Sequence, residues 1–509
     1  MAERAFLVLG DQLFAPSLLP VPSGTRVFMR EDVGLCTDVA HHQQKIALFL
    51  AAMRSHRDVL RERGFAVEYQ ALEEPRAEEP YEEALGRFVR DHRVERLETF
   101  EIGDRGFEAR MLAFATSHGV TLVQHPSPMF ITPTAALDAW MAEQRPHMAA
   151  FYRWQRRRLG VLLEPDGTPR GGQWSFDADN RKPLPRGVEL PGLQPARPTA
   201  HVEAVVPLVA ERFGEHPGEL SVEGWWLPTT RPQALRWLRN FLARRFTDFG
   251  PYEDALSQRD PHLFHAVLTP ALNMGLLTPA EVLGRALTHA AEHETPLQSV
   301  EGFVRQLVGW REFIRGIDRH YGPQQHTRNF FGHRRGLTRH WTEGTTGLPP
   351  LDAAIAKTHR WGWAHHIERL MVTSNLMTLC EIEPRQAYGW FMERFVDSAH
   401  WVMGPNVYGM GLFADGGVFA TKPYICGSNY VRKMSDFSKG PWCDVMDGLY
   451  WRFIARNREF FRRQARLSRV VGNLDRMSVS RKETIFAAAE TFIERTTLAP
   501  PGPQRKPTT

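Results

Sequence analysis

The stretch "AFLVLGDQLFAPSLLPVPSGTRVFMRE" (residues 5–31) carries the strongest fold signal at the start of this 509-residue chain. Two short apolar runs of the kind that form buried β-strands enclose a segment rich in Pro and Ser. Polar residues follow these runs: Gly10, Asp11 and Gln12 after the first and Glu31 after the second. Ligands of open α/β sheets bind beyond the carboxyl ends of the strands, so these residues are candidate ligand contacts.

Strand and helix patterns continue to alternate through the first quarter of the chain. Runs of strand type recur at 65–72, 94–102 and 120–125, and helical periodicity occupies 40–64 and 81–92. This alternation predicts a doubly wound parallel sheet. The sequence contains neither GxGxxG nor GxxxxGK[ST], which argues against a conventional Rossmann or P-loop nucleotide site.

The remainder of the chain has a different character, and its length requires more than one domain. Pro and Gly become frequent after the predicted sheet, and a long helical pattern follows. We predict an α/β domain (1–130), a long interdomain connector (131–225), a larger all-helical domain (226–495) and a disordered tail (496–509).

Composition is that of an ordinary globular protein, with 42% hydrophobic and 24% charged residues. The net charge of +5 permits a polyanionic partner without requiring one. Arg–aromatic clusters at 153–160, 328–341 and 460–469 suit phosphate contact and base stacking, and equally suit Arg stems packed on aromatic rings. The absence of a long apolar run and of a signal peptide, with four scattered cysteines, leads us to expect a cytoplasmic monomer with no membrane span.

Two adjacent histidines stand out in "WAHHIERLM" (363–371). His and Arg side chains on a largely apolar helix face need partners or a ligand, although a satisfied core histidine is the alternative. His365 and His366 have no third ligand at helical spacing, so we predict no metal site.

A set of motifs runs in order through nearly the whole chain: "LGDQL", "HHQQKIALFLAAMR", "GGQWSFDADNRKPLP", "GWREFIRG", "GWAHHIERLM", "PNVYGM", "FADGG", "TKPY" and "GSNYVRKMSDF". Together they resemble the cryptochrome/photolyase family, in particular the prokaryotic branch of (6-4) photolyases and their iron–sulfur relatives. The resemblance implies a doubly wound α/β domain and a larger all-α domain that binds FAD. It also implies light-driven electron transfer from reduced flavin to a pyrimidine lesion flipped out of UV-damaged DNA.

By the same resemblance, residues of the helical domain contact FAD. An Arg beside the flavin can stabilise its reduced, anionic form, and Arg369 and Asp397 match the family's Arg–Asp pair. His265 and Ala266 replace the hydroxyl pair of the family's phosphate segment, while a hydroxyl before Pro270 is retained. The expected FAD contacts are Tyr252, Thr269, Gln306, Arg311, Arg369, Asp397 and Asn406.

The resemblance also assigns the lesion site. Repair of a (6-4) lesion moves an oxygen between two pyrimidines, and imidazole is the side chain suited to give a proton near neutral pH. We expect His366 as the catalytic acid, supported by His365, with Tyr424 and Tyr430 flanking the extruded base. Packing roles remain the alternative for the two tyrosines.

Further family features follow. Trp341 and Trp390 match positions of a chain that re-reduces the flavin, although tryptophan is also good core filler. Gly10, Asp11, Gln12 and Glu31 would hold an antenna chromophore, usually 6,7-dimethyl-8-ribityllumazine in this branch.

We predict no [4Fe–4S] cluster, although many members of this branch hold one. A cluster needs thiolates in number as well as proximity. The expected ligand positions hold Pro349 and Pro350 ahead of the His-His helix and no C-x-x-C after "MSDF", so only Cys443 could match.

The leading hypothesis is a light-driven (6-4) photolyase. The second is a cryptochrome-type blue-light photoreceptor with the same fold and flavin. The third is a flavin-bearing DNA-binding protein without catalysis.

Overall fold

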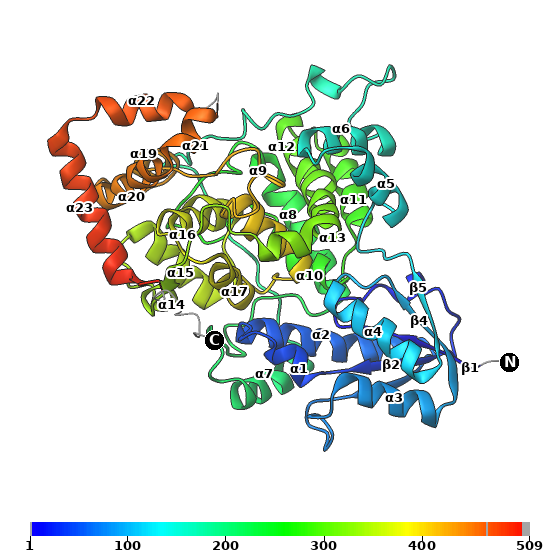
Figure 1. The fold of residues 1–509 in the computed structure, drawn as a ribbon. Helices are drawn as coiled ribbons and strands as arrows, with labels where there is room; N and C mark the ends of the chain where they lie inside the picture. The colour runs from blue at the N-terminus through cyan, green and yellow to red at the C-terminus, as the bar shows by residue number, and fades with distance from the viewer. Residues whose placement is uncertain (1–2, 465–466, 501–509) are drawn as a thin grey trace.

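The computed structural model describes residues 3–464 and 467–500, and it contains the two predicted kinds of domain (Figure 1). All five predicted strands of the α/β domain are present and form one parallel sheet in the order β3-β2-β1-β4-β5. Their bounds are β1 Glu3–Leu7, β2 Arg26–Arg30, β3 Ala66–Gln70, β4 Val94–Phe100 and β5 Thr121–His125.

The sheet is covered on both faces, so its central strands are apolar on both sides. Ala5, Phe6 and Leu7 of β1 are fully buried. Helices α1 Val33–Thr37, α2 Gln43–Glu62, α3 Tyr81–Asp91 and α4 Arg105–His118 connect the strands. Asp32 caps α1 through Leu35 N, and Asp104 caps α4 through Phe107 N. Both caps lie just beyond the carboxyl ends of strands, which brings two carboxylates to that edge of the sheet.

The second domain is helical and lies above the sheet domain in Figure 1. Three of its long helical stretches contain π-helical turns, at Arg305–Trp310, Glu368–Ser374 and Pro405–Gly411. Its α-helices are α8 Arg231–Arg244, α9 Phe246–Phe249, α10 Thr269–Asn273, α11 Pro279–Glu292, α12 Leu297–Val304, α13 Arg311–Thr327, α14 His340–Glu343, α15 Pro349–Trp361, α16 Asn375–Leu379, α17 Pro384–Arg394, α18 His400–Gly404, α19 Ser428–Met434, α20 Trp442–Arg456, α21 Arg458–Arg463, α22 Ser468–Arg476 and α23 Val479–Thr496.

The segment between the domains is more ordered than a bare connector. It contains three helices that the sequence analysis did not predict, α5 Thr134–Glu143, α6 Met148–Leu159 and α7 Ala200–Arg212. Figure 1 shows α5 and α6 beside α12 and α13, whereas α7 lies against α2. The segment therefore adds helices to both domains, and the predicted domain boundaries stay a prediction.

The carboxyl-terminal part departs from the predicted tail in one respect. Strand β7 (Thr497–Leu498) pairs antiparallel with β6 (Gly336–Leu337), so order extends beyond α23. Residues 501–509 of the predicted tail lie outside the described residues. Within the described ranges, no helix has the length and apolarity needed to cross a membrane.

Candidate active site and a second cavity

A cavity of about 340 Å³ lies in the helical domain, and residues from all three π-helical turns line it. Such turns are rare and frequently occur at functional sites. The cavity brings together most of the predicted flavin and lesion residues: Thr269, Gln306, Arg311, His365, His366, Arg369, Asp397 and Asn406.

Arg369 and Asp397 form a bidentate ion pair at the cavity wall. Arg369 Nη1 lies 2.9 Å from Asp397 Oδ1, and Nη2 lies 3.1 Å from Oδ2. Thr269 Oγ1 donates to the same Oδ2 at 2.6 Å, and the guanidinium lies 3.9 Å from the centre of the Phe395 ring. The carboxylate thus fixes the orientation of one cation and one hydroxyl that face the cavity.

Arg311 supplies a second cation. Its Nη1 donates to Asn273 Oδ1 at 2.6 Å and its guanidinium lies 4.9 Å from the centre of the Trp401 ring. Burial lowers the pKa of Arg311 to about 10, so the group stays charged at neutral pH. Its Nε is buried without an acceptor among the described residues, and such an orphaned donor is costly unless a ligand satisfies it. Two cations, a hydroxyl and apolar walls fit a flavin dinucleotide.

Three histidines meet at one end of this cavity. The His265 and His365 rings are stacked, with centres 4.7 Å apart and planes 14° apart, and the centre of the His366 ring lies 5.6 Å from that of His265. Burial holds the pKa values of His265 and His365 well below the ordinary range, so both rings are neutral. Burial also lowers the pKa of His366, but the hydrogen bond from Nε2 to Asp254 Oδ1 at 3.2 Å, together with the negative charges of Asp254 and Glu253, outweighs burial, and the net shift of the pKa is upward.

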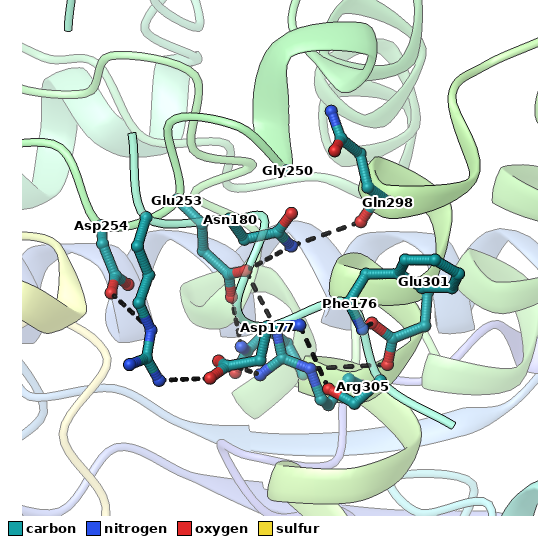
Figure 2. A network of polar contacts seen from close by, with 12 residues as sticks. Phe176, Asp177, Asn180, Gly250, Glu253, Asp254, Gln298, Glu301 and Arg305 are labelled. Atoms are coloured by element: carbon teal, nitrogen blue, oxygen red, sulfur yellow. Dashed lines mark hydrogen bonds and ion pairs between the residues drawn. The ribbon is translucent and has the colours of Figure 1, made fainter. Parts of the chain in front are cut away.

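Asp254 lies in a polar network that includes Glu253, a residue of the cavity wall (Figure 2). In it, Arg305 lies between Glu253 at 3.2 Å, Asp177 at 3.3 Å and Glu301 at 3.5 Å. Phe176 N donates to Glu301 Oε2 at 2.9 Å, which ties the "GGQWSFDADNRKPLP" motif to α12. The network gives that motif a role in holding the loop of Asp254 beside the histidines.

Three predicted residues lie away from the cavity wall. Tyr252 packs on Phe264, with ring centres 5.4 Å apart. Tyr424 and Tyr430 are half-buried; burial raises the pKa of both, with further contributions from the charges of Asp177 at Tyr424 and Asp254 at Tyr430. The two tyrosines therefore lie near the acidic network and do not line the cavity.

Trp341 and Trp390 are joined to each other through the backbone. Trp390 Nε1 donates to Trp341 O at 2.8 Å, and Trp341 Nε1 donates to Thr496 O at 3.0 Å. Trp341 is 0% exposed and Trp390 is 3% exposed. One hydrogen bond therefore links the two tryptophans, and both side chains are buried.

A second cavity of about 460 Å³ lies at the carboxyl ends of the strands, between the domains. Of the four residues predicted there, Gly10, Asp11 and Glu31 line it. Gln12 does not; it is 2% exposed, and its Nε2 donates to Phe100 O at 3.2 Å. The assignment of Gln12 to the antenna stays a prediction that this cavity does not support, because its side chain turns back onto the strand backbone.

The second cavity is rich in charge. Burial raises the pKa of Asp11 to about 6 and lowers that of Lys45 to about 8. Lys45 Nζ donates to Ser398 Oγ at 2.9 Å, which joins α2 to the helical domain. The sequence analysis quoted Lys45 in "HHQQKIALFLAAMR" but missed it as a cavity residue. Its place inside a buried helix face, where lysine is rare, was the available signal.

The cysteines do not form a group. Cys380, Cys426 and Cys443 are buried in apolar surroundings, and burial raises the pKa of Cys426 to about 12. They behave as small hydrophobes in this structure. The lack of an iron–sulfur cluster remains a prediction that rests on the missing ligand positions.

Comparisons with known proteins agree with this geometry. The family of deoxyribodipyrimidine photo-lyase-related proteins matches residues 6–225, and the FAD binding domain of DNA photolyase matches residues 303–439. The chain is 32% identical to a (6-4) photolyase of Agrobacterium fabrum, over 97% of this chain and 99% of that protein.

Solved structures show the same fold. A bacterial class III photolyase from Agrobacterium tumefaciens matches with a TM-score of 0.55 at 17% identity, covering 97% of this chain and 98% of its own. A Synechocystis cryptochrome matches with a TM-score of 0.57 at 13% identity, covering 97% and 99%. With a relative at this identity along its whole length, the chain belongs to the cryptochrome/photolyase family.

Proposed function

We propose that this protein is a FAD-dependent photolyase that uses light to reverse (6-4) pyrimidine photoproducts in UV-damaged DNA. One observation carries the proposal: His366, paired with Asp254, lines the same cavity as the Arg369–Asp397 pair. A proton donor thus stands beside residues suited to a flavin. The similarity to a protein named a (6-4) photolyase supports the assignment.

Bound FAD supplies the excited-state electron for repair. Arg311 and Arg369 place positive charge in the cavity, where it favours an anionic cofactor, and Asp397 keeps Arg369 in place. His366 holds a proton that it can give to the lesion, because Asp254 favours the imidazolium. Repair of cyclobutane dimers needs no such acid, so the presence of His366 paired with Asp254 favours (6-4) chemistry. Tyr424 and Tyr430 would contact the extruded base from the side of the acidic network.

The second cavity would hold the antenna chromophore, for which we retain 6,7-dimethyl-8-ribityllumazine. Gly10 offers small size and the Asp11 carboxylate offers a hydrogen-bond acceptor at the strand ends. The Glu31 carboxylate already accepts from Arg54, Tyr69 and Leu72 N, so it would shape the cavity through these contacts. A Sulfolobus tokodaii photolyase has been solved with two FAD molecules, so a second FAD is the alternative occupant. Release of the bound chromophore by denaturation, followed by its absorption spectrum, distinguishes the two.

Trp390 and Trp341 would return electrons to the flavin, supported by the hydrogen bond that joins them. Substitution of either residue by Phe should slow photoreduction of the flavin by an external thiol. A variant of Trp225, a buried tryptophan elsewhere in the core, is the control.

The decisive experiment illuminates the photoreduced protein with a duplex that carries one (6-4) lesion and scores restored pyrimidines. Repair is expected, and it should be lost in His366→Ala. If a fully reduced flavin gives no repair, the photolyase assignment fails and the cryptochrome-type photoreceptor takes its place. A monomer in the cytoplasm remains our expectation, which size-exclusion chromatography tests for the oligomeric state.

A further inference from the structure

Outside the flavin and antenna contacts, the most unusual feature of the molecule is the cluster of His265, His365 and His366. One ring nitrogen from each lies within 4.8 Å of the others. Among the described residues, these three form the one group of three or more His, Cys, Asp or Glu ligand atoms this close together. Sequence spacing hides the group, because His265 precedes α10 in a loop and the other two precede a π-helical turn.

Two of the rings also have one nitrogen atom without a hydrogen-bond partner. The Nε2 atoms of His265 and His365 are buried without a hydrogen-bond partner among the described residues. His265 is 7% exposed and His365 is 1% exposed. Burying such a polar atom unpaired is costly, so the cavity favours a ligand that engages both.

We propose that His265, His365 and His366 bind a divalent transition metal ion of the zinc type and that the bound ion switches off DNA repair. The second half of this proposal rests on the proposed function, because it assumes that His366 is the proton donor. The first half does not, since it concerns binding alone.

The donor set fits this class of ion. Imidazole suits Zn²⁺, Co²⁺ and Ni²⁺, whereas Mg²⁺ and Ca²⁺ prefer oxygen ligands. Asp254 lies 3.2 Å from His366 Nε2, and Glu368 lies 3.5 Å from His365 Nε2. Both carboxylates lower the cost of bringing a cation into the cavity. A carboxylate on one ring nitrogen of a histidine that binds the metal through the other is typical of zinc sites, and Asp254 can take that place at His366.

Binding requires small movements. Zinc–nitrogen bonds of about 2.0–2.1 Å in a tetrahedral site place the ligand atoms roughly 3.4 Å apart. The three ring nitrogens now lie within 4.8 Å of one another, so they must move closer. The His366 side chain is 45% exposed and has room to turn. His365 Nδ1 accepts from Ile367 N at 3.3 Å, which leaves the proton of the neutral ring on Nε2. Binding of the metal at that Nε2 therefore moves the ring proton to Nδ1, and the hydrogen bond from Ile367 N to Nδ1 is given up.

His366 must also be neutral to bind. It faces Asp254 and Glu253 from the loop after α9, Arg305 from the π-helical turn that follows α12, and the two other histidines. Binding should strengthen as pH rises, since protons compete for the same nitrogen atoms. A metal on His366 occupies the lone pair that would otherwise carry the proton, so repair and metal binding exclude one another.

The test of binding uses the FAD-loaded protein in the dark, titrated with Co²⁺ and followed by the cobalt d–d absorption, with Zn²⁺ calorimetry in parallel. We expect one site per chain, weakened more than about 100-fold by His265→Gln. The matched control is His293→Gln, because exposed His293 stacks on half-buried His289, with ring centres 3.9 Å apart. That control should leave the site intact.

Equal Co²⁺ affinity in wild type and His265→Gln would overturn the proposal, as would loss of the site in His293→Gln. Bound FAD and the circular dichroism spectrum report whether His265→Gln is folded. If that variant does not fold, His265→Asn replaces it. In wild type, Co²⁺ bound at this site should quench the flavin fluorescence, and Zn²⁺ that competes for the same site should relieve the quenching. That result locates the ion near the flavin.

The inhibition is tested separately. Zn²⁺ should suppress repair at least tenfold in wild type and in His293→Gln, and a chelator should restore it. Unchanged repair at saturating Zn²⁺ would overturn the proposal that the bound metal inhibits repair, but it would not contradict metal binding by the three histidines. If no repair occurs without metal, the proposed function fails, and the cobalt titration still decides whether the site exists.

Discussion

The two cavities are lined by different kinds of residues. The cavity in the helical domain has mostly apolar walls with Arg311, Arg369 and three histidines, and π-helical turns aim its side chains. The second cavity collects carboxylates and Lys45 at strand ends and helix caps. Asp397 lines both cavities, so a single layer of side chains separates them at that point. Strand ends gather polar groups by topology alone, whereas the helical cavity depends on contacts between distant segments.

The first prediction tests the chemistry assigned to the helical cavity. His366→Ala should reduce (6-4) repair by about 10²–10⁴-fold, because it removes the positioned acid. FAD content should be unchanged. The control is His320→Ala, which removes another carboxylate-paired histidine, at Asp138 on the surface. A variant with full repair would show that the proton comes from another group.

The second prediction concerns the wall that the cavities share. Arg369→Ala leaves the buried Asp397 without its cation, which should lower the free energy of unfolding by about 3 kcal/mol. The variant should also bind FAD more weakly. Arg105→Ala is the control, because Arg105 makes a similar bidentate pair with Asp318 away from the helical cavity. Denaturant unfolding and flavin release measure both effects; equal FAD affinity in the two variants would contradict a flavin role.

The third prediction addresses the charge of the second cavity. The pKa of Asp11 is raised to about 6 by burial, so the charged form costs stability, and that cost appears as pH rises from about 4 to 6. Asp11→Asn should therefore stabilise the protein by about 1–3 kcal/mol above pH 6 and have little effect below pH 4. The protein is stripped of antenna chromophore and followed by thermal unfolding. Asp91→Asn, at the exposed end of α3, should show no such pH dependence.

The fourth and smallest effect concerns the pH profile of repair. Asp254 raises the pKa of His366, and the acid acts in its protonated form. Asp254→Asn lowers that pKa, so repair should fall at a lower pH than in wild type. Asp177→Asn, which alters the network at Arg305, should leave the profile in place. An unshifted profile in Asp254→Asn would remove Asp254 from the proton-donor site.

Local sequence was sufficient for much of the fold. Short apolar runs gave every strand of the sheet, because parallel strands buried on both faces need continuous apolar residues. The helices of the 131–225 segment were missed, since its Pro- and Gly-rich stretches masked them. Arg156 shows a similar limit: it is buried and lies 5.0 Å from the Trp174 ring, so in this cluster one arginine packs inside and does not offer its charge to a polyanion.

The order of motifs and the alternation of strands and helices were enough to give the family, the sheet and most of the polar residues of the helical cavity. Residue types and their spacing along the chain carry that information. Contacts across long sequence separations do not appear in spacing. The approach of His265 to His365, the shared wall at Asp397 and the inward turn of Gln12 each depend on how separate segments pack. Packing fixes them because a buried side chain takes the orientation that its neighbours allow.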